Sequence, residues 1–91
     1  MVVIVMDTAH PSLRGELTNW LLEPKPGTFV GNLSTAVRER IWDKIRFSPY
    51  KCGGALMIYS TNTEQGFKIE MHGDPKRTII DLDGVQLIKI T

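Results

Sequence analysis

The sequence predicts an α+β protein, a ferredoxin-like sandwich in which one sheet carries two helices on one face. Three observations support this fold class: an apolar run at residues 2–6, two helical patterns in the first half of the chain, and apolar or alternating segments in the last third. The predicted element order is β-α-β-α-β-β-β. With 91 residues, the chain forms a single domain, 1–91, and a domain this small gains from burying further surface in a homodimer.

The first half of the chain begins with Val2–Met6, an apolar, β-branched-rich run that predicts a central strand covered on both faces. A helix is expected over Pro11–Glu23, because proline suits a first turn and apolar residues then recur at helical spacing. Those residues are Leu13, Leu17, Trp20 and Leu21. The prolines of residues 24–27 end the helix, and Thr28–Gly31 predicts a short strand.

Ser34 is a typical N-cap residue and predicts the start of a second helix, which Ser48–Pro49 ends. Ala55–Ser60 and Phe67–His72 flank a turn-rich segment and predict a hairpin whose second strand is half exposed. A polar loop over residues 73–78 follows. Asp83-Gly84 then turns the chain into a final strand within residues 84–91.

The composition excludes several classes of protein. The chain has 11 Lys and Arg against 10 Asp and Glu, so any basic surface must be local. The single cysteine, Cys52, excludes an internal disulfide framework, and the sequence shows neither a signal peptide nor an apolar run long enough to span a membrane. We therefore expect a reduced, soluble protein with a cytoplasmic location.

Three segments together resemble the CRISPR-associated "Cas two" family in its type I-E form. They are the run from Val2 to Ile45, "VVIVMDTAHPSLRGELTNWLLEPKPGTFVGNLSTAVRERIWDKI", the hairpin "TNTEQGF" and the later "KRTIIDLDG". The fragments "LLEPKPGTFVGNLS" and "NTEQGF" are the most specific. The resemblance implies a homodimer of ferredoxin-like protomers held between dimers of the integrase subunit "Cas one", with a captured DNA duplex lying across it before insertion into the CRISPR array.

Asp7 directly follows the first strand, at a place where a carboxylate is held firmly and still reaches solvent. By the resemblance, Asp7 matches an acidic residue that many relatives use in magnesium-dependent cleavage of RNA or DNA. Magnesium needs only one or two protein carboxylates, so two Asp7 side chains at a dimer axis would be enough to form a site. The alternative is structural: Asp7 forms the turn or accepts hydrogen bonds from the start of the helix. His10 is expected to start that helix rather than to act in catalysis.

Four basic residues are predicted to bind DNA. By the resemblance, Arg14, Arg38, Lys76 and Arg77 match positions that contact the phosphate backbone, and guanidinium groups suit that task because they grip phosphate bidentately. Ser12 and Ala36 stand where relatives have further basic residues. Arg40, Lys44 and Arg46 fit an ordinary solvated helix face with acidic neighbours.

The last strand, 84–91, has an edge that needs protection, and we expect it to dock on the integrase subunit. Three functions therefore compete at this stage. The first is a DNA-binding scaffold for spacer acquisition, and the second is a magnesium-dependent endonuclease that uses Asp7. The third is a ferredoxin-like domain that binds a small effector, for which the sequence marks no pocket.

Overall fold

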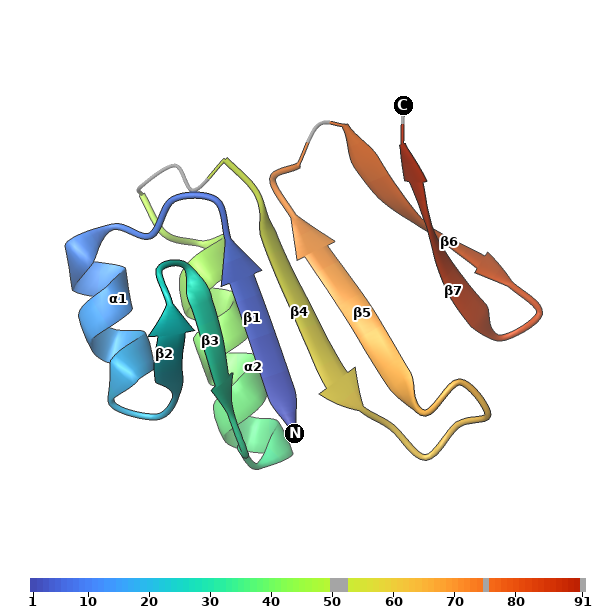
Figure 1. Cartoon of the computed structure of the whole chain (residues 1–91), viewed down its shortest axis with the longest axis horizontal. Coiled ribbons are helices and arrows are strands. Elements are labelled where there is room, and N and C mark those ends of the chain that lie inside the picture. Colours follow the sequence, from blue (N-terminus) through green and yellow to red (C-terminus); the bar gives the residue numbers. More distant parts are fainter. Residues whose placement is uncertain (50–52, 75, 91) are drawn as a thin grey trace.

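The computed structural model describes residues 1–49, 53–74 and 76–90, and it is an α+β protein with two helices and two antiparallel sheets. The elements follow the order β1 (Val2–Met6), α1 (Pro11–Thr18), β2 (Leu22–Lys25), β3 (Thr28–Gly31), α2 (Thr35–Arg46), β4 (Ala55–Ser60), β5 (Phe67–His72), β6 (Arg77–Leu82) and β7 (Val85–Ile90). Five strands form one sheet in the order β2-β3-β1-β4-β5, and β6 and β7 form a separate hairpin beside β5 (Figure 1). No helix among the described residues is long and apolar enough to cross a membrane.

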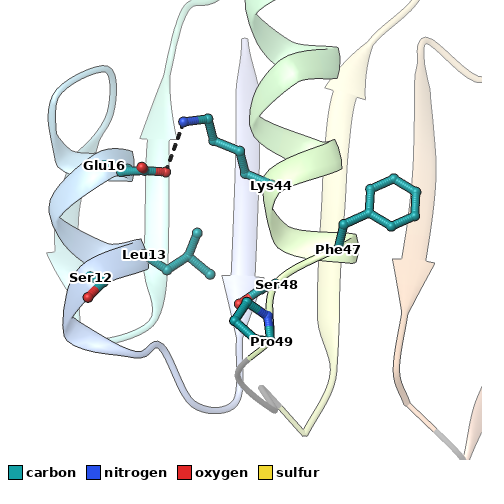
Figure 2. A pocket seen from close by; sticks show the side chains of 7 residues that line it. All are labelled: Ser12, Leu13, Glu16, Lys44, Phe47, Ser48 and Pro49. Carbon is teal, nitrogen blue, oxygen red and sulfur yellow. Dashed lines mark ion pairs between the residues drawn. The ribbon is translucent and has the colours of Figure 1, made fainter.

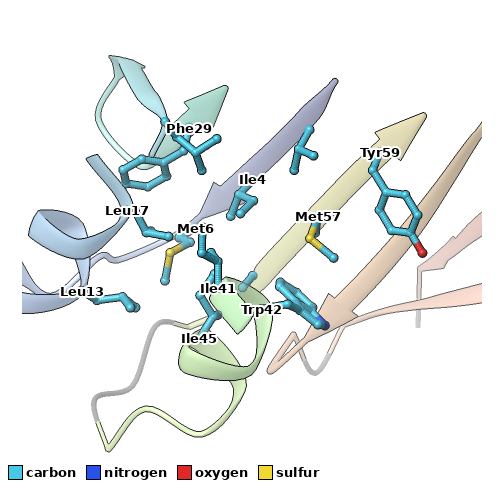
Figure 3. Close-up of a cluster of buried hydrophobic side chains, with 13 residues drawn as sticks. Ile4, Met6, Leu13, Leu17, Phe29, Ile41, Trp42, Ile45, Met57 and Tyr59 are labelled. Carbon is cyan, nitrogen blue, oxygen red and sulfur yellow. The ribbon is translucent and has the colours of Figure 1, made fainter. Parts of the chain in front are cut away.

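The core lies between the helices and one face of the five-stranded sheet (Figure 3). β1 is the middle strand, and every second residue, Val2, Ile4 and Met6, is buried against the helices. The helices meet them with Leu13, Leu17, Ile41, Trp42 and Ile45. Both helices therefore cover the same face of the sheet, as the sequence predicts.

The opposite face of the sheet is open in a single chain, which corrects the expectation that β1 is covered on both sides. Val5 is 37% exposed and Val3 is half-buried. The strand register places Val3 beside Val30 and Ile58, and Ile58 beside Ile69. A continuous apolar surface thus runs across β3, β1, β4 and β5. We call it the open face.

The first helix is shorter than predicted, and a strand follows it. α1 ends at Thr18, whose hydroxyl donates to the carbonyl oxygens of Arg14 and Gly15. The chain then forms β2, a strand missed in the sequence because it contains Pro24. β2 is an edge strand, and an edge tolerates a proline because one side of the strand needs no ladder hydrogen bonds. Trp20, expected in the core, is 53% exposed.

The second helix begins as predicted, and the C-terminal region holds one strand more than expected. The Ser34 hydroxyl accepts a hydrogen bond from Val37 N at 3.3 Å and caps α2. β6 (Arg77–Leu82) begins inside the predicted polar loop, residues 73–78, and continues to the predicted turn at Asp83-Gly84. Asp83 and Gly84 both have positive φ, as a two-residue hairpin turn requires, and they join β6 to β7.

Gly27, in the turn between β2 and β3, has no room for a side chain. Its φ is +83°, and a Cβ atom would lie 2.5 Å from the carbonyl oxygen of Met6. Its own carbonyl accepts from Met6 N at 2.8 Å, so the turn cannot move away without losing that bond. The turn is therefore fixed against the end of β1.

We expect Gly27→Ala to lower the free energy of unfolding by about 2 kcal/mol or more, since it adds both backbone strain and a clash. Urea denaturation measures the change. Gly15→Ala is the matched control: Gly15 is helical and a Cβ there meets nothing within 4 Å. That variant should keep or raise stability, by up to about 1 kcal/mol. Equal losses in the two variants would contradict this account of the turn.

Candidate nucleic-acid interface and carboxylate rim

Asp7 leaves the sheet at the end of β1, and its backbone extends the strand ladder by one bond. Its N–H donates to the carbonyl oxygen of Gly54 at 3.1 Å, and its side chain is exposed. The side chain lies beside two glycines. A Cβ atom on Gly53 would sit 3.3 Å from the Asp7 Cβ, and one on Gly54 would sit 3.2 Å from its Oδ2. The two glycines thus leave space around this carboxylate.

A second carboxylate, Asp74, flanks the same glycine. A Cβ on Gly54 would also lie 3.2 Å from the Asp74 Cβ. Asp74 follows the end of β5. Because β1 and β5 both run antiparallel to β4, the C-terminal ends of β1 and β5 lie at the same end of the sheet. Sequence reasoning missed Asp74 because it is far from Asp7 along the chain. The strand directions would have brought the two together. We call Asp7, Gly54 and Asp74 the carboxylate rim.

The structural alternative for Asp7 was that it forms the turn or accepts hydrogen bonds from the start of the helix, and the structure gives the capping part to another residue. The N-cap of α1 is His10, whose Nδ1 accepts from Ser12 N at 3.2 Å. His10 therefore starts the helix, as expected.

The donor chemistry of the carboxylate rim fits a hydrated magnesium ion with few protein ligands. Magnesium keeps several waters and accepts one or two carboxylates. Asp74 is already engaged: its Oδ1 accepts from Lys76 N at 2.9 Å, and its Oδ2 lies 3.6 Å from Arg77 Nη1. Asp7 is the freer ligand. Among the described residues, no three His, Cys, Asp or Glu side chains gather into a metal-binding group.

Arg14 is held by an acidic side chain. Its Nε lies 3.1 Å from Glu23 Oε2, and the same oxygen accepts from Gly27 N at 3.0 Å. Glu23 therefore links α1 to the turn between β2 and β3. The Arg14 side chain is 43% exposed, so part of it still faces solvent.

Arg38 stacks on an aromatic ring. Its guanidinium carbon lies 3.7 Å from the centre of the Tyr59 ring, a cation–π contact on the helix-covered side of β4. The hollow around this pair, about 350 Å³, is also lined by Arg46 and Lys68 and by three acids, Glu39, Asp43 and Glu70. Its charges balance, so a polyanion is attracted here less strongly than to an isolated cation.

Burial raises the pKa of Tyr59, and the charge of Glu70 and its hydrogen bonding with the phenol raise it further, while Arg38 lowers it. Arg38 thus has a structural partner that the sequence did not reveal. A tyrosine on the strand facing α2 was the available signal.

Lys76 and Arg77 are adjacent and exposed where β6 begins. Arg77 approaches Asp74, so this basic pair lies beside the carboxylate rim. The other two cations lie elsewhere. α1 lies on the β2 side of the sheet, β6 lies beyond β5, and α2 begins at the opposite end of the strands (Figure 1). In one chain the four predicted DNA contacts form separate patches.

Two of the remaining α2 cations, Lys44 and Arg46, are paired. Arg46 contacts Asp43 at 2.8 Å within α2, and Lys44 reaches across to Glu16 of α1 at 3.2 Å. This second pair spans a groove of about 310 Å³ between the helices, in which Leu13 and Pro49 supply apolar lining (Figure 2). Because its two charged side chains satisfy each other, the groove offers little to orient a small polar effector.

The sign of each effect on Tyr59 gives a test of the Arg38 contact. Arg38→Gln should raise the pKa of Tyr59 further, and Glu70→Gln should lower it toward its ordinary value near 10. The ultraviolet absorbance of the phenolate measures both, with Tyr59→Phe as the blank.

The raised pKa of Tyr59 also makes the free energy of unfolding depend on pH. Since the folded protein holds the phenol proton more tightly, this stabilisation is complete below pH 10 and is lost as the pH rises through the folded pKa. Glu70→Gln should weaken that loss. An unchanged Tyr59 pKa in Arg38→Gln would show that the stacked geometry is absent in solution.

A comparison with protein-family models reports one match. Residues 1–87 match the family described as CRISPR-associated protein (Cas_Cas2CT1978). The match includes the whole five-stranded sheet, both helices and the turn of the C-terminal hairpin.

Proposed function

The chain belongs to the CRISPR-associated protein (Cas_Cas2CT1978) family, and from this premise we propose that it is a DNA-binding scaffold of the spacer-acquisition complex, of the type I-E form. In this role a homodimer positions duplex DNA for the integrase subunit "Cas one" in the cytoplasm. The observation that carries the proposal is the surface position of the basic groups: the Lys76–Arg77 pair and Arg14 are reachable from solvent. Phosphate contacts of this kind position a duplex without reading its sequence.

The open face supports the homodimer. Its apolar residues on four strands would be covered by a second copy, and both faces of β1 would then be buried, which is what its uninterrupted apolar sequence favours. The strand order β2-β3-β1-β4, with α1 and α2 on one face, also supports the ferredoxin-like assignment. A two-fold dimer doubles each cation patch and brings patches from two chains onto one assembly.

The C-terminal hairpin supports docking on the integrase subunit. Leu82, Val85 and Leu87 are 56%, 40% and 47% exposed, an unusual run of apolar side chains for a small protein surface. The proposed docking segment is 84–91, of which residue 91 lies outside the described residues.

The second candidate is a magnesium-dependent endonuclease, favoured by the exposed Asp7 beside two glycines and opposite Asp74. Asp7 would hold the ion, and Asp74 would orient Arg77 toward a phosphate. Magnesium, when bound, would polarise the phosphoryl group and lower the pKa of a bound water. The scaffold is the stronger proposal because Asp74 is tied to Arg77 and Lys76.

The scaffold predicts a strong salt dependence. If four cations per chain each meet a phosphate, a dimer makes eight contacts, and log Kd against log salt should have a slope magnitude of about 7 on duplex DNA. Charge reversal at Lys76 and Arg77 removes four contacts, so the slope should fall to about 4 and DNA capture should be abolished. The variant Lys25→Glu with Arg40→Glu makes the same change in net charge at exposed sites outside the proposed contacts. This control should leave a slope near that of the wild type. Normal DNA capture by the Lys76 and Arg77 variant would refute the contact assignment.

Spacer integration in Asp7→Asn separates the two candidates. The substitution removes a charge and keeps the shape of the side chain, so a scaffold should integrate spacers at a rate within about twofold of wild type. Thr8→Ala, at the neighbouring exposed position, controls for local disturbance. Loss of integration together with magnesium-dependent cleavage would establish the endonuclease instead.

A further inference from the structure

Side-chain amides join the C-terminal hairpin to the main sheet. None of its described residues, 77–90, is buried, and β7 does not pair with β5 in a common sheet. Hydrophobic burial therefore contributes little to holding the hairpin in place. To present its exposed apolar side chains to a partner, the hairpin nevertheless needs a fixed orientation relative to the five-stranded sheet.

Two glutamine side chains supply the missing attachment. Gln86 in β7 uses its side-chain amide as a strand would use its backbone: Oε1 accepts from Ile69 N at 2.7 Å, and Nε2 donates to the Ile69 carbonyl at 3.2 Å. Both edge groups of Ile69 in β5 are satisfied in this way. The outer edge of the five-stranded sheet is thereby covered at its centre.

Gln65 makes the reciprocal attachment from the β4–β5 turn. Its Nε2 donates to the Gln86 carbonyl at 3.0 Å, and its Oε1 accepts from Gln86 N at 2.9 Å. Gln86 is thus held by both its backbone and its side chain, with four hydrogen bonds converging on one residue. We call Gln65, Ile69 and Gln86 the glutamine clasp.

The clasp fixes position more than it adds stability. A net hydrogen bond contributes modestly to folding, but two bidentate amide pairs permit only one placement of β7 beside β5. A slip of β7 by one residue against β6 would put Gln86 out of reach of Ile69 and would turn the opposite face of β7 outward. The clasp therefore determines which side chains the hairpin displays.

We propose that Gln65 and Gln86 are positioning residues that lock the C-terminal hairpin against β5 and so preform a protein-docking surface. The lock itself is independent of function. Its role in docking rests on the proposed scaffold function, in which the hairpin meets the integrase subunit. Preforming this surface would lower the entropy cost of binding, compared with a hairpin that orders only on contact.

Amide hydrogen exchange of the full chain, resolved by residue with NMR, tests the lock. In wild type, the amides of Ile69 and Gln86 should be protected although both lie on strand edges. Gln86→Ala should speed exchange at Ile69 by about tenfold, and Gln65→Ala should do the same at Gln86, while the amides of β1 keep their rates. Glu64→Ala and Lys89→Ala, at exposed neighbouring positions, are the matched controls and should stay within about twofold.

Unprotected Ile69 and Gln86 amides in wild type would overturn the lock without any variant, so the test does not depend on a variant folding. Unchanged exchange in Gln65→Ala and Gln86→Ala would overturn it as well.

Binding to the integrase subunit tests the docking role. The double variant Gln65→Ala, Gln86→Ala should bind at least about tenfold more weakly, and Leu87→Ser, which alters the displayed surface, should weaken binding too. Faster exchange with unchanged affinity in the double variant, while Leu87→Ser still weakens binding, would retain the lock and refute its role in docking. Unchanged affinity in both would show that the hairpin is not the docking segment, which refutes that part of the proposed function and leaves the lock standing.

Discussion

The hydrogen-bonded register of β1 between β3 and β4 determines where the carboxylate rim and the turn beside Glu23 lie. Because β1 pairs with a strand on each side, its alternate residues must point either to the helices or to the open face. The ladder continues past the strand, through Met6 N to Gly27 O and Asp7 N to Gly54 O. These two bonds fix the turn beside Glu23 and place Asp7 at the carboxylate rim. The arginine partners and the acidic edge are therefore consequences of one backbone arrangement.

Acidic side chains hold two of the candidate DNA contacts in fixed directions. Glu23 holds Arg14, and Asp74 holds Arg77. Such pairs have two opposing effects on phosphate binding. The acid reduces the local positive charge, which weakens binding, but it also holds the arginine in few rotamers, which lowers the entropy cost of binding. The two arginine side chains are 43% and 49% exposed, so a phosphate can reach them from solvent beside the carboxylate. The pairs are thus compatible with the proposed DNA contacts and would restrict the direction of each arginine side chain.

Local patterns in the sequence predicted several elements well. Ser34 and the alternation of β5 each report a local preference, and the structure confirms the helix cap and the strand. The family resemblance is likewise confirmed at the level of the CRISPR-associated family. The DNA contacts, the homodimer and the metal stay predictions.

The misses have a common physical origin in contacts between distant segments. β2 was hidden because Pro24 disfavours a strand except at an edge, and edge position is not visible locally. Asp74 joined Asp7 only through the strand directions. In the sequence, Gln65 and Gln86 look like ordinary turn and strand residues. Their hydrogen bonds form only because β7 lies beside β5 and the β4–β5 turn. Trp20 followed the helical spacing, but α1 ended before it.

Pro24 also governs how copies of this chain can associate. A strand that lacks one N–H and pairs irregularly with β3 is a poor template for another strand, so the sheet resists lateral growth at β2. At the far edge, a side-chain amide occupies the central backbone groups of β5. For the five-stranded sheet, stacking through the open face avoids both edges, and a two-fold contact of this kind covers the open face of each copy. The geometry thus favours finite assemblies over fibres.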